Sequence, residues 1–169
     1  MKRGADMTEE ASSVTPAVEI LRAAGVTFTD HFYPYEKGGS TEVCARELNI
    51  DEHALVKTIL LEADGNPFIV LMHGDMRAST KELARIIGAK IITPCLPDKA
   101  EQYSGYQAGG ISPFGMHVEI PVYMEETILN LRKVYINGGK RGYLVGMDPY
   151  EAVRILHPTL VKAGASRAA

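Results

Sequence analysis

The sequence predicts one α/β domain, built from a mixed, mostly antiparallel sheet flanked by short helices. Short runs rich in β-branched residues alternate with short amphipathic segments that carry helix-capping signals, a pattern that favours a layered α/β architecture. The connections are too irregular for a doubly wound nucleotide-binding fold. A chain of 169 residues is long enough for a single core and a short tail.

Composition adds limits on location and partners. The chain is 46% apolar and 23% charged, which is ordinary for a globular domain. Its longest apolar runs are too short to span a bilayer and no signal peptide opens it, so we expect a cytoplasmic protein without membrane association. We expect a flexible tail at residues 1–14, the domain at residues 15–162, and a second tail at residues 163–169, with the chain frayed after its last helix.

The first half of the chain has clear boundary signals. Thr15 and Pro16 supply an N-cap and an N1 proline, and Gly25 ends that helix. Residues 26–35 contain Pro34 and predict an edge strand, or a strand followed by a loop. The other predicted elements are a helix at 40–48, a strand at 55–63, a turn at Asp64-Gly65-Asn66-Pro67 and a strand at 68–73 that completes a hairpin.

The second half of the chain also carries signals that mark the ends of helices. Ser79 and Glu82 form a capping box for a helix that ends at Gly88. Asp148 and Pro149 begin another helix, as a cap and an N1 proline. The remaining predictions are strands at 89–93, 117–123, 133–136 and 142–146, and helices at 97–104 and 125–131. The strand at 117–123 contains Pro121, so we expect it at an edge or with a bulge.

Two glycine-rich loops are the strongest candidates for a binding site. The first, Gly109–Gly115, places three glycines and a proline around Ser112. Glycine permits positive φ and close approach of a ligand, and open N–H groups suit a carbonyl oxygen, a phosphate or an oxyanion. The second loop, residues 138–142, adds Lys140 and Arg141. Each loop alone is also compatible with a tight connection between strands, and the two cations with solvated turn charges.

Common catalytic sets are not evident in the sequence. The five histidines show no metal-type spacing, and neither a P-loop nor a dinucleotide fingerprint is present, so we predict no metal and no cofactor. Ser112 is followed directly by Pro113 and lacks the context of a hydrolase elbow. Cys44 and Cys95 are interpreted as reduced, small hydrophobic residues. The net charge of −3 argues against broad, non-specific binding to nucleic acid, so any nucleic-acid contact must come from a local patch, and we expect no DNA partner.

Three motifs, taken together and in this order, resemble the YbaK/ProX family of aminoacyl-tRNA deacylases. They are Val56-Lys57-Thr58, Gly109-Gly110-Ile111-Ser112-Pro113-Phe114-Gly115, and Tyr135-Ile136-Asn137-Gly138-Gly139-Lys140-Arg141-Gly142. The resemblance implies a partly barrel-like mixed sheet. It also implies hydrolysis of the ester that links a wrong amino acid to tRNA, with Cys-tRNA(Pro) as the first candidate substrate and Ala-tRNA(Pro) as the next. The acceptor end of tRNA is then the partner, and a prolyl-tRNA synthetase is a further candidate.

The resemblance also implies roles for individual residues. Lys57 would hold the terminal nucleotide, and the backbone of Gly109 and Gly110 would cradle the reacting carbonyl; these three are the predicted catalytic residues. Tyr33 and Thr58 would line the pocket. The other predicted substrate-binding residues are Ile111, Ser112, Pro113, Asn137, Gly138, Gly139, Lys140 and Arg141. In the cysteine-specific branch the substrate's own thiol attacks the ester, and in the alanine-specific branch a water does so; neither needs a protein nucleophile.

Two departures from the family pattern concern specificity. Many cysteine-specific members have serine where this chain has Asn137, and an acidic residue where this chain has Tyr143-Leu144-Val145. Both positions fall near the implied pocket, so they leave the amino acid open. Two other functions remain as alternatives: a non-catalytic module that binds tRNA or a synthetase, and an esterase for small aminoacyl esters.

Overall fold

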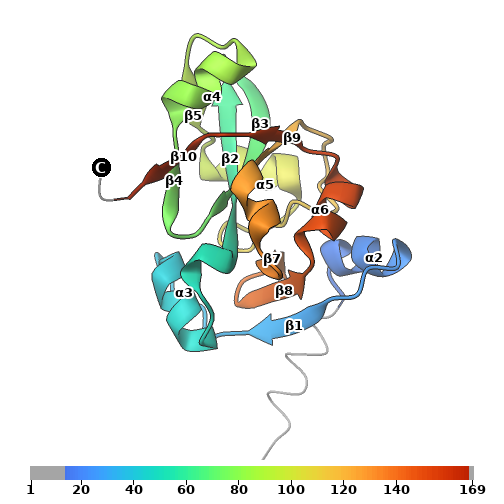
Figure 1. Cartoon of the computed structure of the whole chain (residues 1–169). Coiled ribbons are helices and arrows are strands. Elements are labelled where there is room, and N and C mark those ends of the chain that lie inside the picture. The colour runs from blue at the N-terminus through green and yellow to red at the C-terminus, as the bar shows by residue number, and fades with distance from the viewer. Residues whose placement is uncertain (1–13, 168–169) are drawn as a thin grey trace, which may run out of the picture.

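The longest strand, β2 (Leu55–Ala63), runs through the middle of the molecule and organises the sheet (Figure 1). The computed structural model describes residues 14–167, so most of the predicted N-terminal tail and the last two residues lie outside it. The turn Asp64-Gly65 connects β2 to β3 (Asn66–His73), and its φ angles are 49° and 86°. Positive φ at both positions is what a two-residue hairpin turn requires, and Asp-Gly supplies it.

Eight further strands are short. They are β1 (Thr29–Phe32), β4 (Met76–Ala78), β5 (Ile92–Pro94), β6 (Val122–Glu125), β7 (Val134–Lys140), β8 (Tyr143–Met147), β9 (Thr159–Val161) and β10 (Gly164–Ser166). The main sheet has the order β1-β8-β7-β2-β3-β6-β9, with β5 on the far end of β2, and β4 pairs with β10 separately. Five of these pairings are antiparallel and three are parallel. The predicted mixed, mostly antiparallel α/β fold is therefore confirmed.

The helices begin where their caps predicted. They are α2 (Pro16–Ala23), α3 (Thr41–Leu48), α4 (Thr80–Ile87), α5 (Pro97–Ser104) and α6 (Pro149–Leu156), with 3₁₀ turns η1 (Glu52–Ala54) and η2 (Glu126–Asn130). Thr15, Ser40, Ser79 and Asp148 each accept a backbone N–H of the first turn that follows. In the described part of the chain, no helix has both the length and the apolar content needed to cross a membrane. The α3 and α4 helices lie at opposite ends of β2 (Figure 1).

The core divides into three clusters. The largest packs α2 and the loop residue Phe114 against β2, β3, β7 and β8, and the second packs α4 against the far end of the β2–β3 hairpin. The third is small: Cys44 of α3 packs on Leu55 of β2 and Leu144 of β8. This third cluster fixes α3 over one face of the sheet, where it forms a wall of the candidate site described below.

The strand predicted at residues 117–123 is wrong. The N–H groups of His117 and Val118 donate to the carbonyls of Ser104 and Tyr103 at the end of α5, so they are not available to a ladder. The strand β6 begins only after Pro121 and lies between β3 and β9, not at an edge. The strand predicted at 89–93 is displaced to β5, because the Asp64 carboxylate accepts the N–H groups of Lys90 and Ile91.

The prediction that the chain frays after α6 is also wrong for the described residues. The strand β9 pairs in parallel with β6, and β10 pairs with β4. The buried Glu125 carboxylate accepts the N–H groups of Ala163 (2.9 Å) and Gly164 (2.6 Å), which fixes the connection between the two strands. The last described residues are thus part of the fold, next to β4.

Candidate active site

A cleft opens at a gap in the sheet along one edge of β2. The strand β7 pairs with β2 only at Leu55 and Val56, and β5 pairs with it only from Leu61 to Ala63. Between these pairings no strand of the described chain covers that edge, and Lys57 and Thr58 lie there. The cleft has a volume of about 390 Å³, which is within the range of pockets that hold small ligands.

The cleft brings together residues from distant parts of the sequence. Of the predicted site residues, six line it: Tyr33, Lys57, Thr58, Gly109, Ile111 and Asn137. The others lie outside its lining: Gly110, Ser112, Pro113, Gly138, Gly139, Lys140 and Arg141. The three motifs thus converge on one cavity: the whole of Val56-Lys57-Thr58 lines it, but only Gly109 and Ile111 of the second motif and Asn137 of the third.

Lys57 is the cation of the cleft. Its side chain is half-buried and its Nζ donates to the carbonyl oxygen of Met76 at 2.5 Å. Burial is the main cause that lowers the Lys57 pKa, and the positive charge of Arg167 lowers it further. An ammonium group has three donors, so those not bound to Met76 can meet an anionic or hydroxyl group of a ligand.

Thr58, the next residue on β2, carries an unpaired polar atom. Its Oγ1 is buried and has no hydrogen-bond partner among the described residues. A buried polar atom without a partner costs about 1 to 3 kcal/mol, so such atoms are rare in folded proteins. Because Thr58 lines the cleft, a bound ligand or a water molecule can satisfy this hydroxyl.

The two glycine-rich loops are tied to each other by side chains of the second loop. Asn137 Nδ2 donates to the carbonyl of Gly109 at 3.3 Å, and Asn137 Oδ1 accepts the N–H of Gly139 at 2.7 Å. Arg141 Nε donates to the carbonyl of Ala108 at 2.8 Å. Asn137 and Arg141 therefore hold the first loop in place against the end of β7.

Only some residues of the first loop face the cleft, and polar groups of other residues bond to nearby backbone. Gly109 lines the cleft with a φ of +88°, a conformation that favours glycine. The N–H of Gly110 donates to the carbonyl of Gln107 at 2.8 Å, within the loop itself. Ser112 is fully buried, and its Oγ accepts the N–H of Phe114 at 3.2 Å. Its hydroxyl therefore stabilises the loop instead of facing the cleft.

Sequence reasoning missed one wall of the cleft. This wall is formed by Tyr35, by the segment from Gly38 to the first residue of α3, and by Cys44. The sequence signal was the pair Gly38-Gly39 directly before the Ser40 cap, since a glycine-rich approach to a helix N-terminus often faces a ligand. Burial raises the pKa of the Cys44 thiol to about 11 and that of the neighbouring Tyr33 hydroxyl to about 12.

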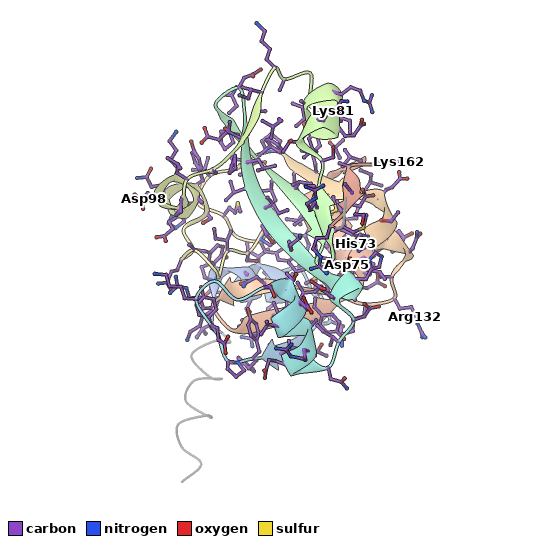
Figure 2. The ribbon with its side chains drawn as sticks, turned by 90° about the vertical axis from the view of Figure 1, so that its left-hand side faces the viewer. His73, Asp75, Lys81, Asp98, Arg132 and Lys162 are labelled. Carbon is purple, nitrogen blue, oxygen red and sulfur yellow. The ribbon has the colours of Figure 1, made fainter. Side chains whose placement is uncertain are left out.

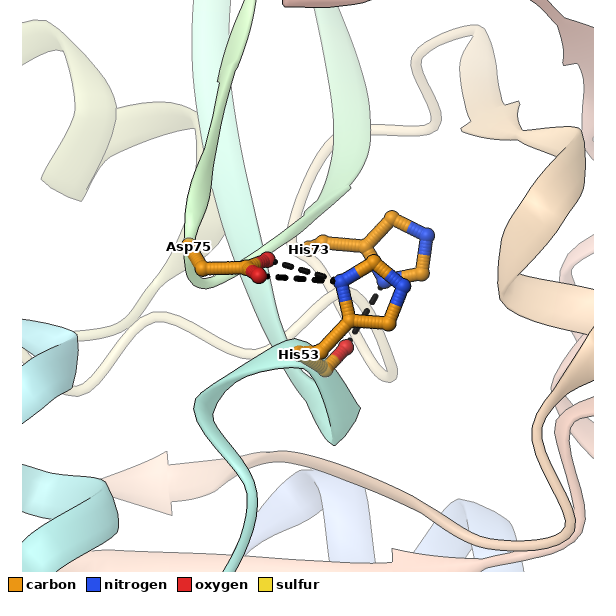
Figure 3. Close-up of side chains that lie close together, drawn as sticks. All are labelled: His53, His73 and Asp75. Carbon is orange, nitrogen blue, oxygen red and sulfur yellow. Dashed lines mark hydrogen bonds and ion pairs between the residues drawn. The ribbon is translucent and has the colours of Figure 1, made fainter. Parts of the chain in front are cut away.

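A second polar cluster, at His53, His73 and Asp75, joins the η1 turn to the end of β3 and to the β3–β4 turn (Figures 2 and 3). His53 Nδ1 is 2.9 Å from an Asp75 oxygen, and the two imidazole rings are stacked at 3.7 Å, nearly parallel. His73 is fully buried; its Nδ1 lies 2.7 Å from the His53 carbonyl and its Nε2 lies 2.7 Å from Thr127 Oγ1.

The three side chains are close enough to be considered as metal ligands. However, ring nitrogens bind a metal through lone pairs in the ring plane, and the lone pairs of two parallel stacked rings do not converge on one point. Both nitrogens of His73 are also engaged with protein groups. We therefore interpret the cluster as a buried hydrogen-bond network that holds the β3–β4 turn.

Buried His73 makes stability depend on pH. Burial lowers the pKa of His73 below its ordinary value of 6.5, so the unfolded chain binds more protons as the pH falls below that value. We expect the free energy of unfolding, measured by urea denaturation, to fall on acidification below about pH 6.5, by at most about 1.4 kcal/mol per pH unit for this one proton. The full contribution of His73 is present above this range.

The experiment compares how steeply the free energy of unfolding changes with pH in wild type and in two histidine variants. In His73→Gln the free energy of unfolding should change less between about pH 6.5 and pH 5 than in wild type, because the amide does not titrate. His157→Asn replaces an exposed histidine whose φ of 47° suits asparagine, and it should keep the wild-type slope. Equal slopes in His73→Gln and wild type would contradict the assignment.

Comparison with known proteins agrees with this geometry. The aminoacyl-tRNA editing domain profile matches residues 36–155. EbsC of Enterococcus faecalis, a candidate Cys-tRNA(Pro)/Cys-tRNA(Cys) deacylase, is 25% identical over 137 residues, which are 80% of this chain and 84% of that protein. A proline–tRNA ligase of Lactiplantibacillus plantarum is 25% identical over 105 residues, 62% of this chain but only 18% of the ligase.

The fold has a match of the same kind. A crystal structure of a candidate trans-editing enzyme for prolyl-tRNA synthetase superposes with a TM-score of 0.76 at 17% identity, over 91% of this chain and all of that one. At this identity the likeness concerns the fold. Because the family profile covers most of the chain, the resemblance inferred from the three motifs is confirmed: the chain belongs to the aminoacyl-tRNA editing domain family of deacylases.

Proposed function

We propose that this protein hydrolyses the ester of mischarged aminoacyl-tRNA in trans, with Cys-tRNA(Pro) as the first substrate and Ala-tRNA(Pro) as the second. Lys57 would hold the 3′-terminal nucleotide, and the backbone around Gly109 would face the aminoacyl carbonyl. The relatives named above supply the choice of tRNA and amino acid. A prolyl-tRNA synthetase is the proposed protein partner, and the cytoplasm the proposed location.

The gap in the sheet is the observation that carries this proposal. There a half-buried ammonium and a buried, unpaired hydroxyl belong to adjacent residues of the same strand, and both residues line the cleft together with Gly109 and Ile111 of the first glycine loop. Such a site offers polar groups to a ligand that brings both an anionic group and a hydroxyl-rich sugar, as the end of a tRNA does. Apolar neighbours such as Ile111 and Leu144 leave room for a small side chain.

The cleft has a thiol but not a thiolate. With a pKa of about 11, Cys44 stays protonated at neutral pH and is a poor nucleophile. This supports a reaction in which the cysteine bound to the tRNA attacks its own ester carbonyl through sulfur. The new C–S bond closes a β-thiolactone, the ester C–O bond breaks, and the thiol proton passes to the departing ribose oxygen. Water then opens the thiolactone to free cysteine. For alanine a water would take the place of the thiol, and proximity would supply much of the acceleration in both cases.

The test is deacylation of tRNA(Pro) charged separately with cysteine, alanine and proline. We expect loss of the cysteine ester, slower loss of the alanine ester, and survival of the proline ester. If all three esters survive at high enzyme concentration, the proposal fails and the non-catalytic binding module takes its place. Equal hydrolysis of small aminoacyl esters and charged tRNA would instead favour the small-molecule esterase.

Thr58→Val separates ligand binding from folding. Valine has nearly the same shape and removes the unpaired hydroxyl, so we expect the free energy of unfolding to stay the same or to rise by up to about 1 kcal/mol. We expect kcat/KM for the charged tRNA to fall about tenfold, because the ligand loses one hydrogen bond. Thr58→Ser keeps the hydroxyl and should retain most of the activity. Full activity in Thr58→Val would show that the hydroxyl does not meet the substrate.

A further inference from the structure

The ammonium of Lys57 depends on the position of one backbone carbonyl. That carbonyl belongs to Met76, the first residue of β4, and it accepts from Nζ at 2.5 Å. Met76 follows directly on the turn Gly74-Asp75 that links β3 to β4. Whatever fixes this turn therefore also fixes the direction in which the Lys57 side chain extends.

The turn is held from the side of the cleft. Thr41, a cleft residue at the start of α3, has its hydroxyl 2.8 Å from the carbonyl of Gly74 and 2.6 Å from Glu52 Oε2. Asp75 is paired with His53, which follows Glu52 in the η1 turn (Figure 3). A side chain at Gly74 would collide with the backbone of η1, since its Cβ would lie 2.7 Å from the Glu52 carbonyl.

The C-terminal strand β10 and the residue that follows it contact β4 and the η1 turn. In the register of β4 and β10, Ser166 is opposite Met76. The next residue, Arg167, donates from Nη1 and Nη2 to the two carboxylate oxygens of Glu52, at 2.8 and 3.0 Å. The Glu52 side chain is only 14% exposed, whereas the Arg167 side chain is 45% exposed. Arg167 is also the largest cause that lowers the Glu52 pKa.

These contacts form a closed ring around Lys57. It runs from Arg167 through Glu52 and Thr41 to the turn, then to Met76, and returns through the β4–β10 pairing. We infer that Arg167 and Glu52 are positioning residues that hold the Lys57 ammonium at the cleft for its ligand, so that the C-terminal end of the chain completes the active site. This inference rests on the proposed function for the identity of the ligand.

The charges around the ring make this role measurable. Arg167 and Lys57 repel each other, while Glu52 and Asp75 attract Lys57. Loss of the Arg167 charge should therefore raise the Lys57 pKa, and exposure of Lys57 would raise it too, because burial is the main cause that lowers it; Arg167→Lys keeps the charge and separates the two effects. If Lys57 binds the terminal nucleotide equally in the ground and transition states, its displacement should appear in KM with little change in kcat.

The experiment uses the full chain with Arg167→Ala, Arg167→Lys and Glu52→Gln. The matched control is Arg85→Ala, which breaks an exposed Arg85–Glu82 pair on α4, at the far end of β2, where two guanidinium nitrogens donate to one carboxylate oxygen. Three quantities are measured: KM and kcat for charged tRNA(Pro), the affinity for an uncharged RNA hairpin that ends in CCA, and the Lys57 side-chain titration by NMR.

For Arg167→Ala we expect KM to rise and the affinity for the hairpin to fall, each about five- to tenfold, with kcat within about twofold. The Lys57 titration should move to higher pH, Arg167→Lys should recover part of the loss, and Arg85→Ala should match wild type. In Lys57→Ala the further change Arg167→Ala should leave the hairpin affinity unchanged. An Arg167→Ala variant that folds with an unmoved Lys57 titration and unchanged hairpin affinity would overturn the inference.

The proposed function can fail independently of this inference. Wild-type protein that hydrolyses none of the charged tRNAs would remove the deacylase activity. The Lys57 titration would still show whether Arg167 acts on Lys57, since that measurement needs neither substrate nor turnover.

Discussion

Lys57→Ala is expected to lower kcat/KM for deacylation about 100-fold or more, the largest effect on activity that the structure predicts. The ammonium is half-buried at the uncovered edge of β2, where it is the cation that lines the cleft among the described residues. A partly desolvated charge interacts more strongly with an anionic or hydroxyl ligand than an exposed one. The measurement is single-turnover deacylation of Cys-tRNA(Pro) at enzyme concentrations below saturation, where the rate reports kcat/KM.

Two controls make this result specific. Lys162→Ala removes an exposed lysine, 82% exposed at the surface, and should leave the rate unchanged (Figure 2). Lys57→Arg keeps the charge but replaces a compact ammonium by a planar, longer group, so it should restore only a small part of the rate. A Lys57→Ala variant within threefold of wild type would rule out the role proposed for this residue.

The elements with local signals could be predicted closely. The caps at Thr15, Ser79 and Asp148 and the Asp64-Gly65 turn act within a few residues of the chain, so the sequence alone contains their cause. The strand β2 was also predicted with its observed bounds, because seven of its nine residues are apolar or β-branched and leave few alternatives.

The elements that were missed depend on distant partners. The strands β4, β9 and β10 have three residues each, and their partners are far away in the sequence. No local pattern reports that the carboxylate of Glu125 will accept the N–H groups of Ala163 and Gly164. For the same reason the contribution of Arg167 could not be anticipated, because it follows from a strand that the sequence did not indicate.

The candidate site was anticipated through resemblance more than through residue chemistry. The three motifs supplied Lys57, Gly109 and Asn137, which do line one cleft. The motifs did not reveal that Ser112 and Gly110 bond within their own loop, because hydrogen bonds of that kind depend on the loop's final shape. The wall at Gly38 to Cys44 lies outside all three motifs, although its glycine pair before a helix cap was a readable signal.

Gly110→Ala is expected to destabilise the fold by about 1 to 3 kcal/mol and to reduce deacylation in the protein that still folds. A Cβ at this position would lie 2.7 Å from the backbone nitrogen of Arg141 and 2.8 Å from the carbonyl carbon of Lys140. These atoms are backbone, so a side-chain rotation cannot relieve the overlap. The first glycine loop would have to move away from β7, and with it the hydrogen bond between Asn137 and Gly109.

The displacement should be visible at the cleft, because Gly109 lines it and its carbonyl is held by Asn137. Urea denaturation measures the stability, and deacylation at a temperature where the variant is fully folded measures the effect on the site. Gly65→Asn is the matched control: no neighbouring atom lies within 4 Å of the added Cβ, so a loss of stability there reports only the cost of a side chain at a φ of +86° and not a collision. Wild-type stability in Gly110→Ala would show that the two loops can separate without cost, and the close contact between them would then have no part in shaping the site.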